Sequence, residues 1–140
     1  MKYIQIYEHF TGPQEIEKVN QEKLGDIIDK SMTTNDKPIL IYTESGEMGT
    51  PQFQQILSEM GISASFVSLG RSVPSDFNTI VGAEVVVCFD LDDAKEDVAS
   101  IAMDKATSGD CQYIFTASDL EKIPREILDR CRIVSYLRKK

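Results

Sequence analysis

The stretch PILIYTESGEMGTPQFQQILSEMG, residues 38–61, joins an apolar run, a glycine-containing loop and a helical pattern. Residues 38–42 have the length and composition of a buried strand, and residues 43–50 form the loop. Pro51 suits the start of a helix, where its missing N–H would be unpaired anyway, and Gly61 suits the end. The apolar stripe of this helix consists of Phe53, Ile56, Leu57 and Met60. The stretch therefore predicts a strand–loop–helix unit.

Strands and helices are expected to alternate along the rest of the chain as well. Apolar runs predict strands at residues 3–7, 63–69, 84–89, 111–116 and 133–136. Helical spacing predicts helices at residues 93–105 and 124–129, and one that contains Ile16, Val19, Leu24, Ile27 and Ile28 and leads into a polar loop at 33–37. We therefore expect a three-layer α/β fold, a mainly parallel sheet flanked by helices, in one domain over residues 1–140.

Charge and hydropathy exclude several classes of function. The net charge of −8 argues against general nucleic-acid binding, which needs cations to neutralise phosphates. The basic C-terminus is a local exception that fits a solvated tail or a docking patch, and it includes Arg130, Arg132, Arg138, Lys139 and Lys140. No apolar run has the length of a membrane span, and the N-terminus lacks the apolar core of a signal peptide. These features predict a cytoplasmic protein without a membrane partner.

The cysteines and the single histidine predict no cofactor site. The chain has an odd number of cysteines, and no two of them have CxxC spacing: they are Cys88, Cys111 and Cys131. We therefore expect reduced thiols in a reducing compartment. His9 is the only histidine, which makes a zinc site an unfavourable interpretation. We expect no bound cofactor.

The loop after residues 38–42 has the position of a phosphate-binding P-loop but not its residues. Residues 46–53 lie where GxxGxGK[ST] would lie, with Gln52 at the lysine position and Phe53 at the magnesium hydroxyl position. Pro51 replaces the last glycine and has no N–H, and Glu47 would repel a phosphate. We therefore expect almost no ATP binding here, and the segment also fits a plain strand–helix junction. The degenerate cofactor-binding candidates are Gly46, Gly49, Thr50 and, from a later strand, Ser118.

An acidic turn follows the 84–89 strand. In P-loop ATPases an aspartate after this strand holds magnesium and the next acid polarises the attacking water. Asp90 fits the first position and is a weak metal candidate, whereas Leu91 occupies the second and cannot activate water. The alternative is that Asp92 or Asp93 caps the following helix.

The segment from residue 114 to 131 resembles AAA+ ATPases most specifically. Residues 114–119 look like a sensor strand with Ser118 near its polar position, and residues 123–131 are similar to the "IP" and Ser-Arg-Cys motifs of clamp-loader subunits. Residues 10–15 resemble the box before the first AAA+ helix, so the match covers roughly residues 8–136. The resemblance implies that Arg130 reaches a neighbouring subunit's ATP as an arginine finger. The alternative is that Arg130 forms a surface salt bridge with Asp129 or Glu126. It also implies that the helical lid is missing, because the chain ends where the lid would begin.

A competing resemblance is to glutaredoxins, on residues 41–61 and on 72–74, which read Ser-Val-Pro. The redox cysteines of that family would fall at Glu47 and Thr50, so such a fold could not exchange disulfides. The resemblance fails after residue 80.

Three functions follow as hypotheses. The first is a non-catalytic AAA+-like protein that binds or regulates a partner AAA+ ATPase, for example in replication or in clamp or helicase loading, through the Arg130 edge. Self-association is the alternative use of that edge. The second is a weak nucleotide-binding ATPase with an atypical P-loop. The third is an α/β interaction domain that neither regulates an ATPase nor binds a nucleotide.

Overall fold

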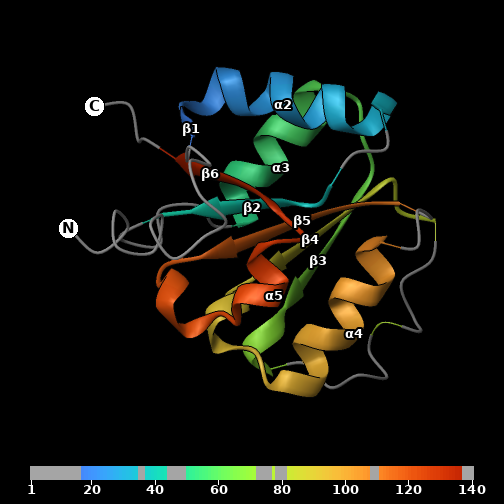
Figure 1. Cartoon of the computed structure of the whole chain (residues 1–140). Coiled ribbons are helices and arrows are strands. Elements are labelled where there is room, and N and C mark those ends of the chain that lie inside the picture. The colour runs from blue at the N-terminus through green and yellow to red at the C-terminus, as the bar shows by residue number, and fades with distance from the viewer. Residues whose placement is uncertain are drawn as a thin grey trace.

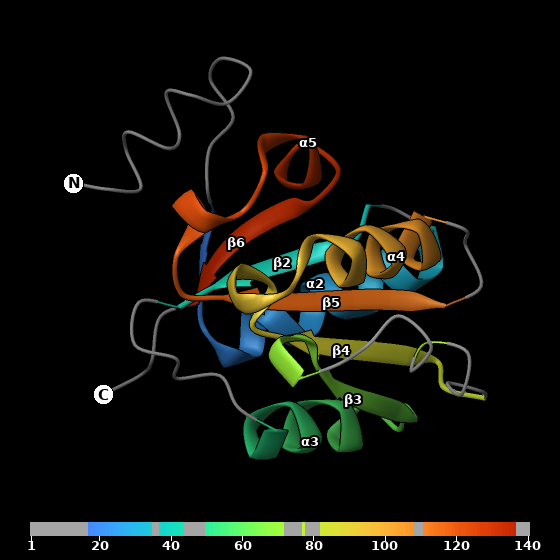
Figure 2. The same cartoon turned by 90° about the horizontal axis from the view of Figure 1, so that it is seen from below.

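The computed structural model describes residues 17–34, 37–43, 50–71, 77, 82–107 and 111–136. Its strands form one parallel sheet of six strands in the order β1-β6-β2-β5-β4-β3. Figure 2 shows β6, β2, β5, β4 and β3 in that order from top to bottom. The strands are β1 (Glu17–Val19), β2 (Ile39–Tyr42), β3 (Ala64–Ser68), β4 (Val85–Phe89), β5 (Gln112–Ala117) and β6 (Arg132–Tyr136). The prediction of a mainly parallel sheet is confirmed.

Helices cover both faces of this sheet. Helices α2 (Gln21–Thr34) and α3 (Thr50–Glu59) lie on one face, and α4 (Glu96–Thr107) and α5 (Arg125–Leu128) lie on the other (Figure 1). Short 3-10 helices follow three of the strands: η1 (Leu69–Arg71), η3 (Leu91–Asp93) and η4 (Leu120–Lys122). The fold is therefore the expected three-layer α/β arrangement. None of the described helices is both long and apolar enough to cross a membrane.

The central strands supply side chains to two separate cores, one on each face. Along β4, Val86 and Cys88 pack on the α4 and α5 side, whereas Val85 and Val87 pack on the α2 and α3 side. This alternation follows from the two-residue period of a strand. All four side chains are buried, which explains why the 84–89 run is apolar throughout.

The first described elements differ from the predicted helix. Val19 lies in β1, opposite Tyr136 of β6, so strand pairing overrides its helical spacing. Helix α2 begins directly after Asn20, whose side-chain Oδ1 accepts a 2.9 Å hydrogen bond from the Lys23 N–H, as an N-cap residue does. It continues to Thr34, so the predicted loop at 33–37 begins later than expected. The predicted strand at 3–7, Ile16, the 10–15 box and the last three basic residues of the tail, 138–140, lie outside the described residues.

Helix α3 matches its prediction closely. Phe53, Ile56 and Leu57 are buried against the sheet, while Met60 is half-buried. Gly61 follows with a φ of 71°, a left-handed conformation in which glycine is favoured after a helix. The strand and the helix predicted from residues 38–61 are therefore both confirmed.

Candidate functional site

The candidate site lies at the edge of the sheet where the parallel strands end. Strands β2 and β4 both pair with β5, so the residues after these strands come to the same edge. A 3.0 Å hydrogen bond from the Thr43 N–H to the Ala117 carbonyl joins two of the strand ends directly. Ligands of open α/β sheets bind at this edge, which makes it the place to examine the predicted site residues.

The loop between β2 and α3 carries the predicted phosphate-binding residues. Gly46 and Gly49 lie outside the described residues, and Thr50 is the first residue of α3. Phe53, which the sequence aligned with the hydroxyl position of a P-loop, is fully buried in the first turn of α3. This position therefore holds a core aromatic ring.

The sequence around the start of α3 has no cationic residue. Residues 43–53 contain Glu44 and Glu47 but neither lysine nor arginine. No residue of this segment therefore carries the charge with which a P-loop lysine contacts a nucleotide phosphate.

Aromatic rings anchor the first turn of α3 on the sheet. The Phe53 ring packs edge-on against the ring of Phe89, the last residue of β4, with centroids 5.7 Å apart. The Phe89 ring stacks on Phe66 of β3 at 6.1 Å. Phe53 is thus a core residue, since aromatic pairs of this geometry stabilise packing beyond the buried area alone.

Asp90 follows β4 directly in an unusual backbone conformation. Its φ of 64° is the only positive value among the described residues other than glycine. The Asp90 N–H donates a 3.2 Å hydrogen bond to Thr116 Oγ1 on β5, which fixes the turn against the neighbouring strand. Partial burial, and then the charges of Asp92 and Asp93, raise the pKa of the Asp90 carboxyl. The described residues contain no group of three or more side chains that could hold a metal ion.

Asp92 joins the acidic turn to the loop after β5 instead of capping a helix. Its Oδ2 accepts hydrogen bonds from the Ser118 N–H at 3.3 Å, the Ser118 hydroxyl at 3.1 Å and the Asp119 N–H at 3.1 Å. Helix α4 begins only at Glu96, so the prediction that Asp92 or Asp93 caps it is wrong. The hydroxyl of Ser118, a predicted nucleotide contact, is directed to Asp92 within the protein.

Leu91 points away from the strand ends and into the packed layer below. It is 4% exposed and belongs to the core that α4 and α5 cover. The position at which P-loop ATPases hold a water-polarising acid is therefore an apolar core position in this chain.

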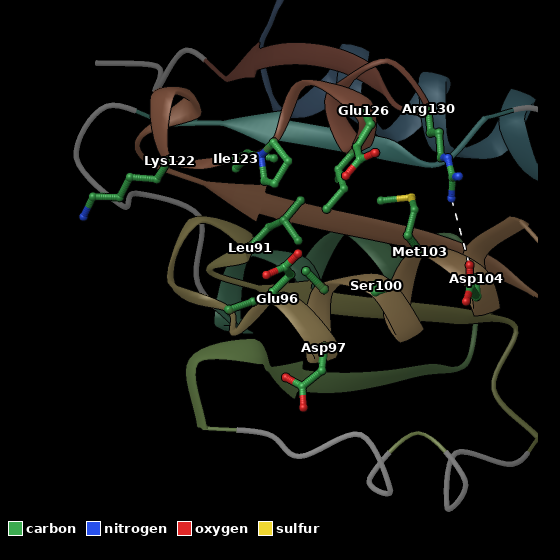
Figure 3. Close-up of a pocket in the computed structure, with 14 residues that line it drawn as sticks. Leu91, Glu96, Asp97, Ser100, Met103, Asp104, Lys122, Ile123, Glu126 and Arg130 are labelled. Carbon is green, nitrogen blue, oxygen red and sulfur yellow. Dashed lines mark ion pairs between the residues drawn. The ribbon is translucent and has the colours of Figure 1, made fainter.

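Leu91 also lies at one end of a groove of about 790 Å³ between α4 and the η4–α5 segment (Figure 3). Met103 of α4 and Ile123 and Ile127 of the opposite segment lie beneath the groove as core residues that are 1–8% exposed. Charged side chains lie along its walls and its far end, and these are Glu96, Asp97, Asp104, Lys122, Glu126 and Arg130. The sequence did not predict this groove, because it depends on the packing of two separate helices.

Arg130, the predicted arginine finger, lies at the end of this groove. Its Nη1 is 4.0 Å from Oδ1 of Asp104, across the groove on α4 (Figure 3). The expected ion pair was with Asp129 or Glu126, so this prediction is corrected. The side chains are 54% exposed for Arg130 and 73% exposed for Asp104, and such a pair contributes at most about 1 kcal/mol.

The backbone below Arg130 is held firmly. The Arg130 N–H donates to the Ile127 carbonyl at 3.1 Å, and the Cys131 N–H donates to the Leu128 carbonyl at 3.1 Å. Cys131 is fully buried, and burial raises the pKa of its thiol to about 12. An exposed arginine therefore lies next to a buried cysteine, in a turn held by backbone hydrogen bonds.

The sheet order, the strand–loop–helix unit and the acidic strand end together define an AAA+-like P-loop α/β fold. Solved structures of the RuvB Holliday junction branch migration motor of Thermotoga maritima share this fold. The first matches at a TM-score of 0.63 with 11% identity, and two single-residue variants of the same motor match at 0.61 and 0.60 with 14% identity. Each match covers 84% of this chain but only 43% or 44% of the RuvB chain.

No family model and no curated protein sequence matches this chain. Identities of 11–14% to RuvB establish the fold alone. Of the two resemblances in the sequence, the AAA+-like one is the one that these structural matches support. The chain spans less than half of the length of the RuvB chains that it matches.

Proposed function

We propose that this protein is a non-catalytic AAA+-like protein that binds and regulates a partner AAA+ ATPase through the edge that carries Arg130. The observation that carries the proposal is the contrast between two places in the fold. The segment 43–53 contains no lysine or arginine, whereas Arg130 is exposed next to the buried Cys131.

The strand-end site supports the non-catalytic part of the proposal. The segment 43–53 has no cation, and the buried Leu91 stands where a catalytic acid would polarise water. Asp92 and Ser118 bind each other, so two further polar groups near the site are already used. Without a phosphate-binding cation and a water-polarising acid, phosphoryl transfer loses its main sources of catalysis.

The surroundings of Arg130 support the regulatory part. An arginine supplied to a neighbouring subunit's γ-phosphate is worth about 10³–10⁵ in rate. Within the described part of the chain, the Arg130 side chain forms one exposed ion pair, with Asp104, so a phosphate could replace Asp104 at little cost. The resemblance of residues 123–131 to clamp-loader subunits suggests clamp-loader and helicase-loader ATPases as the first partners to test.

The test is the ATPase rate of such a partner, measured with wild type, Arg130→Ala and Arg130→Lys. If Arg130 acts as a finger, wild type stimulates the partner and both variants lose the stimulation, because lysine lacks the planar guanidinium. If the protein is an inhibitor at this edge, wild type lowers the rate and Arg130→Ala restores it. Equal rates and equal binding for all three proteins would overturn the proposal.

A second candidate is nucleotide binding without hydrolysis. Thr50 favours it, because it is a hydroxyl residue at the start of the helix after the loop and P-loops bind magnesium through such a residue. Asp90 would be the matching acid. The measurement is thermal unfolding with Mg-ATP. Ligand at a hundred times its Kd adds about 2.7 kcal/mol of stability, so an unchanged midpoint at millimolar Mg-ATP would eliminate this candidate.

A further inference from the structure

The groove between α4 and the η4–α5 segment has no role in the proposed function so far. Its lining comes from helices and the turns that join them, and no strand edge is among its residues. A bound strand would find no backbone partner there, whereas the side chains of a helix can pack into a furrow between two helices.

The charges on the walls of the groove are mainly negative. Glu96 lies on the α4 wall and Glu126 on the α5 wall (Figure 3), and neither forms an ion pair with any of the described residues. Asp104 adds a carboxylate at the far end, where it meets Arg130. Lys122 extends away from the groove (Figure 3), so it does not offset this charge inside. A cationic ligand with an apolar side fits these walls and the apolar residues of the lining.

We propose that this groove binds an amphipathic helix of the partner protein, with lysines or arginines toward Glu96 and Glu126. Its apolar side chains would lie against Ala94 and Pro124, the apolar residues of the lining that are not buried. The inference rests on the proposed function in that the partner is the same. Helix α4 has 12 residues and is about 18 Å long, so it can hold a helix of about three turns.

Binding at this groove would also affect Arg130. A partner cation at the far end would compete with Arg130 for Asp104, since the two charges of that pair are only 4.0 Å apart and exposed. The released guanidinium could then turn toward the partner's phosphate. Binding of the partner helix and release of the Arg130 guanidinium are thereby coupled through the Asp104 carboxylate.

The test uses the full chain and a synthetic helix as the probe. A stapled, fluorescein-labelled peptide of about three turns carries leucines on one face and lysines beside them. The comparison peptide has glutamate in place of each lysine. We expect the lysine peptide to bind in a salt-sensitive manner and to shift the methyl NMR signals of Met103 and Ile127, while the glutamate peptide does neither.

Matched variants test the charged walls. The double variant Glu96→Gln and Glu126→Gln should weaken binding of the lysine peptide roughly five-fold. The control is Asp26→Asn with Asp29→Asn, two exposed residues of α2 on the opposite face, which removes the same charge and should change nothing. Equal effects of both doubles, binding of both peptides alike, or unmoved Met103 and Ile127 signals would overturn the inference. The peptide measurements do not use an ATPase. The groove proposal can therefore fail while the Arg130 proposal holds, and the Arg130 proposal can fail while the groove proposal holds.

Discussion

Asp92 and Ser118 are 26 residues apart in the sequence, yet Oδ2 of Asp92 accepts hydrogen bonds from both the hydroxyl and the backbone N–H of Ser118. Together with the bond from the Asp119 N–H, this carboxylate fixes the loop after β5 against the turn after β4. The pair therefore joins the ends of two neighbouring strands of the sheet.

The first prediction concerns this pair. Asp92→Ala removes the acceptor of three hydrogen bonds and should lower the free energy of unfolding by about 1–2 kcal/mol. Asp93→Ala is the matched control, because Asp93 is exposed and its carboxylate has no hydrogen bond to the described residues; it should cost less than about 0.5 kcal/mol. Urea unfolding of both variants checks the difference, and equal losses would contradict a specific role for Asp92.

The second prediction concerns Phe53. Phe53→Ala should cost about 3–5 kcal/mol, because the ring is fully buried and packs on Phe89. Phe53→Thr should also destabilise the protein and should not create Mg-ATP binding, since position 53 lies one helical turn inside α3. A stable Phe53→Thr variant that gains Mg-ATP binding would contradict the interpretation of position 53 as a core position.

The sequence predicted the layers well because the central strands are buried on both faces. Val85 to Cys88 can only be a strand between two helical layers, and this pattern is local. Val19 was assigned to the wrong element because its pairing with β6 involves residues more than a hundred positions away. Local spacing carries no information about such a partner.

The site was predictable in its residue types but not in its contacts. Asp90 and Leu91 could be placed directly after an apolar strand, and both follow β4 in the structure, whereas the burial of Leu91 was not predicted. The partner of Asp92 and the partner of Arg130 could not, because Ser118 and Asp104 reach them only after separate elements pack together. The groove between α4 and α5 has the same origin.

The third prediction concerns the backbone at Asp90. A φ of 64° costs a residue with a Cβ about 1 kcal/mol or more relative to glycine, although aspartate tolerates it better than most. Asp90→Gly should therefore be neutral or stabilising, whereas Asp90→Ala should be about 1 kcal/mol less stable than Asp90→Gly. Gly82→Ala is the internal reference, because Gly82 has a φ of 77° and open space around an added Cβ. This variant should lose a similar amount of unfolding free energy. Thermal unfolding measures all three variants, and a more stable Asp90→Ala would refute the left-handed turn.

The fourth prediction is a pH dependence from Cys131. Its thiol pKa is raised by burial from 9.0 to about 12, so the unfolded chain releases this proton at a lower pH than the folded protein. The contribution of this thiol to the free energy of unfolding is fully present below pH 9. It is lost as the pH rises toward 12, at about 1.4 kcal/mol per pH unit. Cys131→Ala should therefore show a shallower fall of the unfolding free energy in this range. Parallel curves for the two proteins would contradict the buried, neutral thiol.

The last prediction separates the structural from the functional role of Arg130. The Arg130–Asp104 pair is long and exposed on both sides, so Arg130→Ala and Asp104→Ala should each change the free energy of unfolding by less than about 0.5 kcal/mol. The coupling energy in a double-mutant cycle should likewise be near zero. Any loss of partner regulation in Arg130→Ala then reports on the guanidinium itself and not on damage to the fold. A coupling energy above about 1 kcal/mol would instead make the pair a structural element and would remove the low cost at which a phosphate could replace Asp104.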